Sequence, residues 1–339
     1  MRILVISSDR TSELGRPINL GDAMLTDALV LALRGRGHEA VAADFGYERE
    51  GGGEPRLRLS GLRALLLAMR DVDGVVIGGG TLLQDDARDV RGGWGGLPRL
   101  CAVSSVLGRL AGNRVAFYGV GCDPVDRIGA RTLLRLAVKG VPVWVRDEKS
   151  AVRVEKTLRG RAIVGADASL LMGAEPRGAS GDDAPVVVAL NGEHARDLRV
   201  EHVRSLRQVG RPLVFLNMLQ GGSFMDSSAL SADVRSEFDL ITGPLDWDEA
   251  FRLIRSADSV WGSRMHALYA AMLSGVPMVA LSSLPKVVTF AEDFDVPRVA
   301  TPESIAESTP READAGALSS AIATAERTLD DLLVVFHGR

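Results

Sequence analysis

The stretch that most constrains the fold is residues 256–290, where two short apolar runs enclose a helical stretch. Residues 259–262 and 278–281 predict buried strands. The helix between them is expected to end before Gly275 and Pro277, because glycine commonly follows a helix C-terminus and proline cannot extend a helix. A strand–helix–strand unit of this size crosses over between two parallel strands. The chain is therefore expected to build a parallel α/β sheet.

Similar units recur along the whole chain and predict two domains. Strands are expected at 1–7, 39–43, 73–77, 114–118, 141–145 and 162–165, and then at 185–190, 213–217, 239–242, 259–262, 278–281 and 297–300. Between the two sets lies GAEPRGASGDDA (173–184), whose composition predicts a linker. We expect two doubly wound, Rossmann-like α/β domains, 1–175 and 184–310, that face a cleft in a GT-B-like arrangement. A last helix within 311–339 is long enough to pack back on the first domain.

Composition excludes several classes of function. The formal net charge is −4 and the basic residues are scattered, so nothing indicates nucleic-acid binding. The two cysteines, Cys101 and Cys122, form neither a metal-binding spacing nor a disulfide framework, as expected in a reducing cytosol. The N-terminus enters a predicted strand directly, and no apolar run approaches the ~20 residues of a membrane span. We expect a cytoplasmic protein with no bound metal and no membrane span.

Cationic residues follow the predicted strands at their carboxyl ends. Arg264 and His266 come just after 259–262, Lys286 lies in an expected loop after 278–281, and Arg146 follows 141–145. The carboxyl ends of parallel strands share one edge of a sheet, where ligands usually bind. Cations beside a helix N-terminus make a good anion site. Singly, each is more readily an ordinary loop residue, and Arg146 a salt-bridge partner; together they favour a functional site.

Other candidates for substrate binding are glycine or polar residues beside strand ends. Gly79 and Gly80 follow the strand 73–77, where glycine either brings backbone N–H groups to a phosphate or makes a tight turn with positive φ. Asp22 precedes a predicted helix, and Asn191 ends the strand 185–190. Trp94, between glycine pairs, could stack on a sugar or equally anchor its own loop.

The chain resembles the polysaccharide pyruvyl transferase family in blocks that occur in the same order along nearly its whole length. They are LGDAMLTDAL (20–29), DGVVIGGGTLLQDD (73–86), VAFYGVGCDP (115–124), VWVRDEKSA (143–151), GADASLL (165–171) and ADSVWGSRMHALYAAMLSGVPMVALSSLPKV (257–287). The last block is the most specific, since it matches the spacing of the family's Arg-Leu-His-Ala…Gly-Val-Pro…Pro-Lys-Val pattern. Met265 replaces the commoner leucine.

The resemblance implies a GT-B-like enzyme that uses phosphoenolpyruvate and no cofactor. Such an enzyme builds a 1-carboxyethylidene ketal across two hydroxyls of a sugar. By resemblance, Arg264, Met265 and His266 match the segment that grips the donor, while Arg146 and Lys286 match residues implicated in activity. The chain departs from the family pattern at three places: the segment RPIN before Gly-Asp, Ala23, and residues 282–284. These departures bear on the identity of the acceptor more than on that of the donor.

The implied chemistry suits these residue types. The carboxylate and phosphate of phosphoenolpyruvate call for arginine forks and a lysine point charge. Attack of a hydroxyl at C2 accompanies protonation of C3, for which His266 is the natural general acid or base. Arg264 and Lys286 would stabilise the departing phosphate. On this interpretation His266, Arg146 and Lys286 are catalytic, and no metal is required.

Three alternatives stay open at this point. The chain could be a GT-B sugar-nucleotide glycosyltransferase, or a diverged family member acting on a small natural-product scaffold. A sensor of a phosphorylated metabolite is the third, although binding alone would not need the histidine. The acceptor could be a sugar, a nucleotide-sugar or a lipid-linked glycan, and a homo-oligomer is left open. A lipid-linked acceptor would place the protein peripherally at the inner face of the membrane, yet no strong amphipathic basic helix is visible in the sequence.

Overall fold

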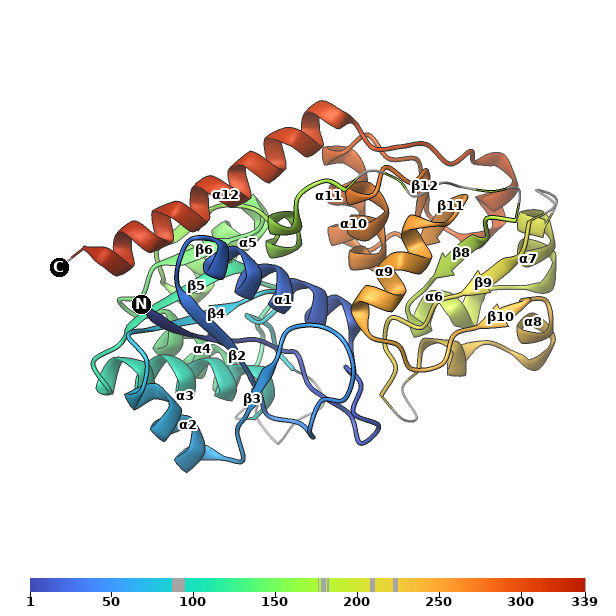
Figure 1. The fold of residues 1–339 in the computed structure, drawn as a ribbon. Helices are drawn as coiled ribbons and strands as arrows, with labels where there is room; N and C mark the ends of the chain where they lie inside the picture. The colour runs from blue at the N-terminus through green and yellow to red at the C-terminus, as the bar shows by residue number, and fades with distance from the viewer. Residues whose placement is uncertain are drawn as a thin grey trace.

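The computed structural model describes residues 1–86, 95–175, 177, 181, 183–207, 211–221 and 225–338. Two sheets lie side by side, each with helices on both faces (Figure 1). The predicted α/β class with two doubly wound sheets is confirmed. Trp94 and part of the predicted linker, including residues 178–180, lie outside the described residues.

Every strand pair in both sheets is parallel. The first sheet has the order β3 (Arg56–Arg58), β2 (Glu39–Asp44), β1 (Arg2–Ile6), β4 (Gly74–Gly78), β5 (Arg114–Val120), β6 (Val143–Val145) and β7 (Ala162–Val164). The second has the order β10 (Leu240–Ile241), β9 (Leu213–Phe215), β8 (Val186–Ala189), β11 (Ser259–Gly262), β12 (Met278–Leu281) and β13 (Arg298–Val299). The winding direction switches between β1 and β4 and between β8 and β11. Such switch points open a crevice at the carboxyl ends of the strands.

Helices cover both faces of each sheet, which is why the strands appear in the sequence as continuous apolar runs. On the first sheet, α2 (Leu62–Arg70), α3 (Gly96–Leu110) and α4 (Ile128–Val138) cover one face, and α1 (Leu20–Gly35) and α12 (Ala315–His337) cover the other. On the second sheet, α9 (Trp247–Arg255), α10 (Met265–Leu273) and α11 (Pro285–Asp293) lie on one face, and α6 (Gly192–Asp197), α7 (Val200–Arg207) and α8 (Ala232–Ser236) on the other. The short helix α5 (Glu148–Arg153) follows β6. Among these described helices, none is long and apolar enough to cross a membrane.

The last helix returns to the first sheet. Figure 1 shows α12 running from the side of the second sheet across the first. Leu329, Leu332 and Phe336 are fully buried there, and the Tyr118 hydroxyl donates to the Ala325 carbonyl over 2.6 Å. The first hydrophobic core is therefore completed by the end of the chain.

Hydrogen bonds and apolar contacts join the two halves beside the crevice. Asn19 forms an antiparallel bridge with Leu219, and the Leu20 N–H donates to the Met218 carbonyl over 2.9 Å. The Trp247 indole donates to the buried carboxylate of Asp27 over 2.5 Å. Leu20 also packs in the core of the second domain. These contacts fix the start of α1 against the second domain.

Two local predictions were wrong. The apolar residues of the segment 57–69 predict one helix over that whole range, but residues 56–58 form the edge strand β3 and α2 begins at Leu62, after Gly61 with φ of 89°. The expected loop around Lys286 is the first turn of α11. Pro285 occupies the first helical position, where its missing N–H removes no helical hydrogen bond. Lys286 is thereby held on a helix.

Candidate active site

A cavity of about 500 Å³ lies between the carboxyl ends of the two sheets. Its walls come from both halves of the molecule and are rich in charged and amide side chains. They include Ser8, Arg10, Asn19, Asp22, Gly80, Thr81, Gln84, Asp86, Leu97, Asp123, Arg146, Asn191, Met218, Ser263, Arg264, Met265, His266 and Lys286. The parallel topology of each sheet brings these strand-end residues to one place.

Of the candidate residues predicted from the sequence that the structure describes, all but one line the cavity. Gly79 does not line it and packs against Leu25. Gly79 and Gly80 have φ of 82° and 74°, so both make the tight turn that was the alternative interpretation. At Gly80 a Cβ would lie 3.1 Å from the Asp22 carboxylate. Because glycine has no Cβ, the backbone of Gly80 can lie close to this carboxylate at the cavity wall.

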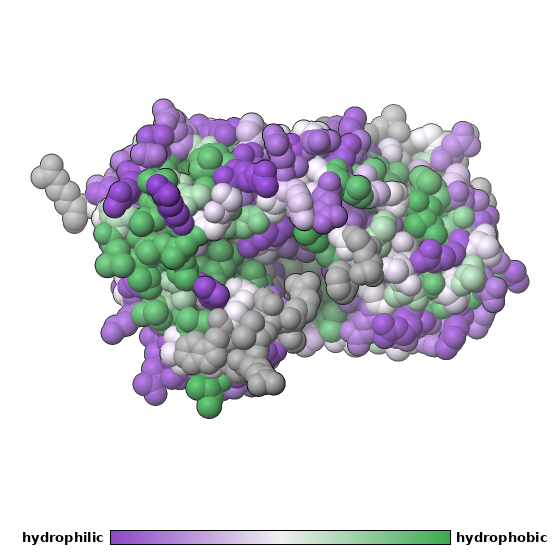
Figure 2. Space-filling model, turned by 90° about the horizontal axis from the view of Figure 1, so that it is seen from below, coloured by the Kyte–Doolittle hydropathy of each residue, from purple (hydrophilic) through white to green (hydrophobic). Residues whose placement is uncertain are grey.

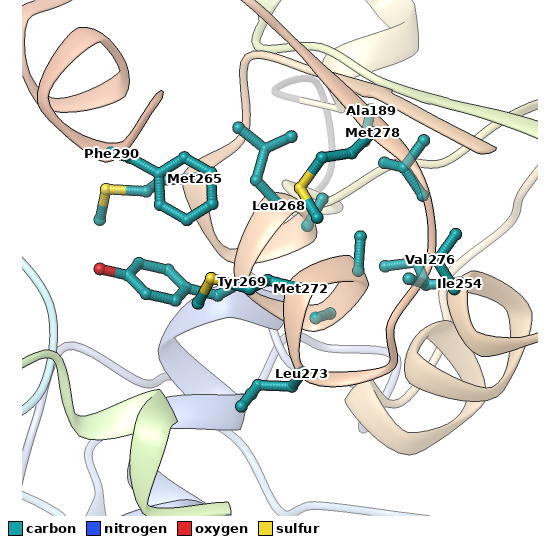
Figure 3. Close-up of a cluster of buried hydrophobic side chains, with 14 of the residues drawn as sticks. Ala189, Ile254, Met265, Leu268, Tyr269, Met272, Leu273, Val276, Met278 and Phe290 are labelled. Carbon is teal, nitrogen blue, oxygen red and sulfur yellow. The ribbon is translucent and has the colours of Figure 1, made fainter. Parts of the chain in front are cut away.

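His266 is positioned by a helix that is buried on nearly every side. Helix α10 packs through Leu268, Met272 and Leu273, and Figure 3 shows Tyr269 and Met265 directed towards Phe290. The Tyr269 ring stacks on the imidazole of His266 at 6.1 Å between centroids. On the other side a Cβ at Gly21 would lie only 2.4 Å from Nδ1 of His266. The ring is thus held between α10 and the first turn of α1.

Asp167 is the residue that sequence reasoning missed most clearly. It is buried just after β7, with one carboxylate oxygen 3.8 Å from Nε2 of His266 and 3.7 Å from Nη1 of Arg146. Its other oxygen accepts from the Ser169 N–H over 3.0 Å. Burial acts to raise the pKa of Asp167, but His266 and Arg146 together lower it to about 2. The carboxylate is therefore ionised at neutral pH. Its position just after the strand predicted at 162–165 was the signal in the sequence by which Asp167 could have been identified.

Arg146 is almost fully enclosed. Its side chain is 6% exposed, and its guanidinium donates to the Thr81 hydroxyl over 3.1 Å. Gly121 makes room for it, since a Cβ there would lie 2.8 Å from Cζ. Asp147 caps α5 by accepting from the Ser150 N–H over 2.7 Å. Arg146 is thus a fixed cation that also touches the Asp167 carboxylate.

Arg264 is paired within the protein. Its Nε donates to the buried carboxylate of Asp226 over 3.0 Å, and its Nη2 pairs with the second oxygen of that carboxylate. Asp226 also accepts from the Leu219 N–H over 2.9 Å. The two-point bond orients Arg264 at the cavity wall. Its Nη1 has no partner within the described part of the chain.

Lys286 has no hydrogen bond or ion pair among the described residues. Its side chain is exposed within the cavity, where partial desolvation lowers the pKa of Lys286 and the charges of Arg146 and Arg264 lower it further. Crowding of three cations without a carboxylate bound to Lys286 favours a ligand that is an anion. Arg10, missed by the sequence interpretation, adds a fourth cation to the walls.

Asp22 places a carboxyl group opposite these cations. It lies in the first turn of α1 and accepts from the Asn19 amide over 3.0 Å. Burial raises the pKa of Asp22, and His266 offsets part of this effect. A carboxyl group with a raised pKa beside an imidazole is typical of acid–base sites.

Asn191 caps α6 by accepting from the His194 N–H over 2.9 Å.

A second cavity of about 320 Å³ adjoins the first. Arg146, Met265 and Lys286 line both, and Lys149 and Tyr269 line the second. Within the part of the chain that the structure describes, no cluster of three or more histidine, cysteine or carboxylate side chains could hold a metal ion.

Solved structures with similar folds are sugar-nucleotide enzymes. UDP-GlcNAc 2-epimerase from Methanocaldococcus jannaschii superposes with a TM-score of 0.60 at 10% identity, covering 98% of this chain and 100% of that one. A putative UDP-N-acetylglucosamine 2-epimerase from Listeria monocytogenes gives 0.57 at 14% identity, with 98% of each chain covered. A UDP-glucosyltransferase from Polygonum tinctorium gives 0.51 at 10% identity, covering 100% and 99%. At these identities the likeness establishes the GT-B fold alone.

The sequence itself identifies the family. A comparison with curated protein sequences finds no match. The family model described as polysaccharide pyruvyl transferase matches residues 19–285, which include every cavity-lining residue predicted from the sequence except Lys286, one position beyond it. The chain therefore belongs to the polysaccharide pyruvyl transferase family and is a transferase.

Proposed function

We propose that the protein transfers the 1-carboxyethylidene group of phosphoenolpyruvate to two hydroxyls of a sugar or glycan precursor. The observation that carries this proposal is the convergence of Arg146, Arg264 and Lys286 on His266 in one cavity. Phosphoenolpyruvate has two anionic groups, and fixed arginines with a lysine lacking a bound carboxylate complement both. The acceptor class stays open, a nucleotide-sugar or lipid-linked glycan included.

In this mechanism His266 is the general acid and Asp22 the general base. An acceptor hydroxyl attacks C2 of phosphoenolpyruvate, giving its proton to Asp22, while His266 protonates C3 to form the methyl group. Asp167 stabilises the imidazolium before this transfer. Phosphate then leaves as a second hydroxyl attacks C2. This hydroxyl gives its proton to the now neutral His266, and the departing phosphate takes the proton held by Asp22, so both groups return to their starting forms. The products are one ketal and inorganic phosphate, and no cofactor or metal takes part.

The two domains have different proposed tasks. Arg264, His266 and Lys286 come from 184–310, which we assign to phosphoenolpyruvate, with Arg146 reaching it from the other side. Asp22, Gln84 and Asp86 lie on 1–175, and carboxylates and amides are suited to sugar hydroxyls. We therefore assign the first domain to the acceptor.

Lys286→Met gives the clearest test of the donor. Arg264→Ala would leave the buried Asp226 carboxylate unpaired, so weaker binding could reflect damage to the fold. Lys286 has no such partner among the described residues. We expect calorimetric titration with phosphoenolpyruvate to show saturable binding that Lys286→Met weakens by at least about tenfold, while the control Lys156→Met, at an exposed lysine, binds normally.

Product analysis tests the reaction. Incubation with phosphoenolpyruvate and candidate sugars should release phosphate and yield a ketal methyl signal by NMR. Consumption of a UDP-sugar without phosphoenolpyruvate would instead identify a glycosyltransferase, the class of one structural neighbour. Turnover of phosphoenolpyruvate with a small non-sugar scaffold alone would identify a diverged acceptor. Equal binding of phosphoenolpyruvate by Lys286→Met and the unaltered protein would place the donor elsewhere.

A further inference from the structure

One face of the first domain combines exposed apolar side chains with positive charge. It is formed by α2, α3 and α4, here called the outer helical layer. Its most exposed large apolar side chains are Leu62, Leu67, Leu110, Ile128 and Leu136, which are 60%, 50%, 78%, 78% and 46% exposed. Figure 2 views the molecule from the side on which these helices lie and shows apolar side chains gathered there among hydrophilic ones. An apolar gathering of this kind marks an interaction surface.

The charge of this layer is of one sign. Its three helices contain six arginines, Arg63, Arg70, Arg99, Arg109, Arg131 and Arg135, and no aspartate or glutamate. The complete chain has a formal net charge of −4, so the local charge of these three helices is opposite in sign to that of the chain as a whole. The nearest carboxylates along the chain, Asp71 and Asp126, lie just beyond helix ends.

These guanidinium charges are not neutralised by carboxylates within the described ranges. Arg109 donates to the carbonyls of Lys139 and Leu136 over 2.8 and 3.1 Å, and Arg135 donates to that of Thr157 over 2.9 Å. A carbonyl orients a guanidinium but leaves its charge in place. Arg70, Arg109 and Arg135 also lie in the last turns of their helices, where a cation stabilises the helix end. Arg63 and Arg99 lie elsewhere and are exposed, so helix stability does not account for them.

Exposed apolar side chains together with unneutralised arginines favour one kind of binding partner over others. A second copy of this chain would bring two arginine-rich surfaces together in a symmetric dimer, and like charges would oppose it. Nucleic acid would use the charge but would not bury leucine and isoleucine. A membrane with anionic headgroups uses both, because apolar side chains enter the headgroup boundary while arginines attract the lipid charge. We propose that the outer helical layer docks on an anionic membrane surface.

The layer adjoins the cavity. Gly96 and Leu97, in the first turn of α3, line the cavity wall, so one element belongs to both. A membrane-docked protein would hold this wall near the headgroups. If the pyruvyl transfer proposed above is correct, a lipid-linked acceptor could enter from that side. The docking itself does not depend on the reaction.

Vesicle co-sedimentation of the full chain tests the docking. We expect binding to vesicles of phosphatidylcholine with phosphatidylglycerol, and little binding to phosphatidylcholine alone. At about fivefold per basic residue, Arg63→Gln/Arg70→Gln/Arg99→Gln should weaken binding by about 100-fold. Leu67→Ser/Leu110→Ser should weaken it by about tenfold and leave its salt dependence unchanged. Arg196→Gln/Arg252→Gln, two exposed arginines of the second domain, is the control and should bind normally.

The outcomes separate the explanations. Absence of binding to anionic vesicles overturns the proposal, as does equal binding by the outer-layer variants and the control. Sedimentation velocity without lipid addresses the other partner: a dimer that Leu67→Ser/Leu110→Ser converts to a monomer would assign the layer to self-association and also overturn it. Circular dichroism of each variant establishes that it is folded. Phosphoenolpyruvate titration in solution, which needs no membrane, reports separately on the proposed function.

Discussion

At the residue scale, Asp167 should support catalysis through His266. The Asp167→Asn variant keeps an oxygen for the Ser169 N–H but removes the negative charge 3.8 Å from Nε2 of His266. The protonated imidazole then loses its stabilising neighbour, so we expect turnover to fall by about 100-fold. The pH–rate profile is the diagnostic measurement, because activity should be lost at a lower pH than in the unaltered enzyme. A uniform fall with an unchanged profile would assign Asp167 a purely structural role.

Removing the charge of Asp22 should lower activity but raise stability at neutral pH. Its raised pKa means that the folded protein holds this proton more tightly than the unfolded chain, so stability declines as the pH rises from the unfolded pKa of 3.8 to the folded value. Above that range the cost of burying the ionised group is constant. Asp22→Asn should therefore raise the melting temperature at neutral pH, with no difference below about pH 3, while losing activity. Equal melting temperatures at neutral pH would contradict this.

At the scale of a helix, Gly21 tests how α1 positions the catalytic ring. In a helix, alanine is more favourable than glycine by about 1 kcal/mol. A Cβ at Gly21 would nevertheless lie 2.4 Å from Nδ1 of His266. Gly21→Ala should therefore lower activity by about 100-fold, since a displacement near 1 Å is enough for such a loss.

Gly35, in the last turn of the same helix, is the matched control. A Cβ there meets nothing within 4 Å, so Gly35→Ala should retain activity and not lower the melting temperature. Steady-state kinetics and thermal melts of both variants make the comparison. Full activity of Gly21→Ala would mean that the imidazole is not held by this contact.

At the scale of the whole molecule, the end of the chain should contribute much of the stability of the first domain. Phe336 is fully buried against Gly74 of the central strand β4. Phe336→Ala should lower the free energy of unfolding by about 3–5 kcal/mol, because truncating a fully buried aromatic side chain leaves a cavity in the core. The neighbouring Val335 is 46% exposed, so Val335→Ala should cost less than about 1 kcal/mol. Urea denaturation of both variants makes the comparison. Similar midpoints for the two variants would show that burial of Phe336 contributes little to stability.

The sequence by itself determined the local elements and the edge at which the site lies. β11 and β12 occupy the residues predicted for them, because short apolar runs bounded by glycine and proline depend on neighbouring residues alone. Parallel topology follows from strand–helix–strand spacing, and it places Arg146, Arg264, His266 and Lys286 at strand ends without knowledge of their contacts. The edge strand β3 was missed since three residues carry too weak a pattern.

Only the tertiary structure decided which of these side chains are paired and how the surfaces are composed. The bond between Arg264 and Asp226 joins residues 38 positions apart, and the approach of Asp167 to His266 joins a loop of one domain to a helix of the other. The return of α12 to the first sheet and the arginine-rich layer of α2, α3 and α4 likewise join segments distant in sequence. No single helix of that layer shows its character, because each supplies two arginines. Pairing and surface composition depend on distances through space, and the order of residues along the chain carries no direct record of them.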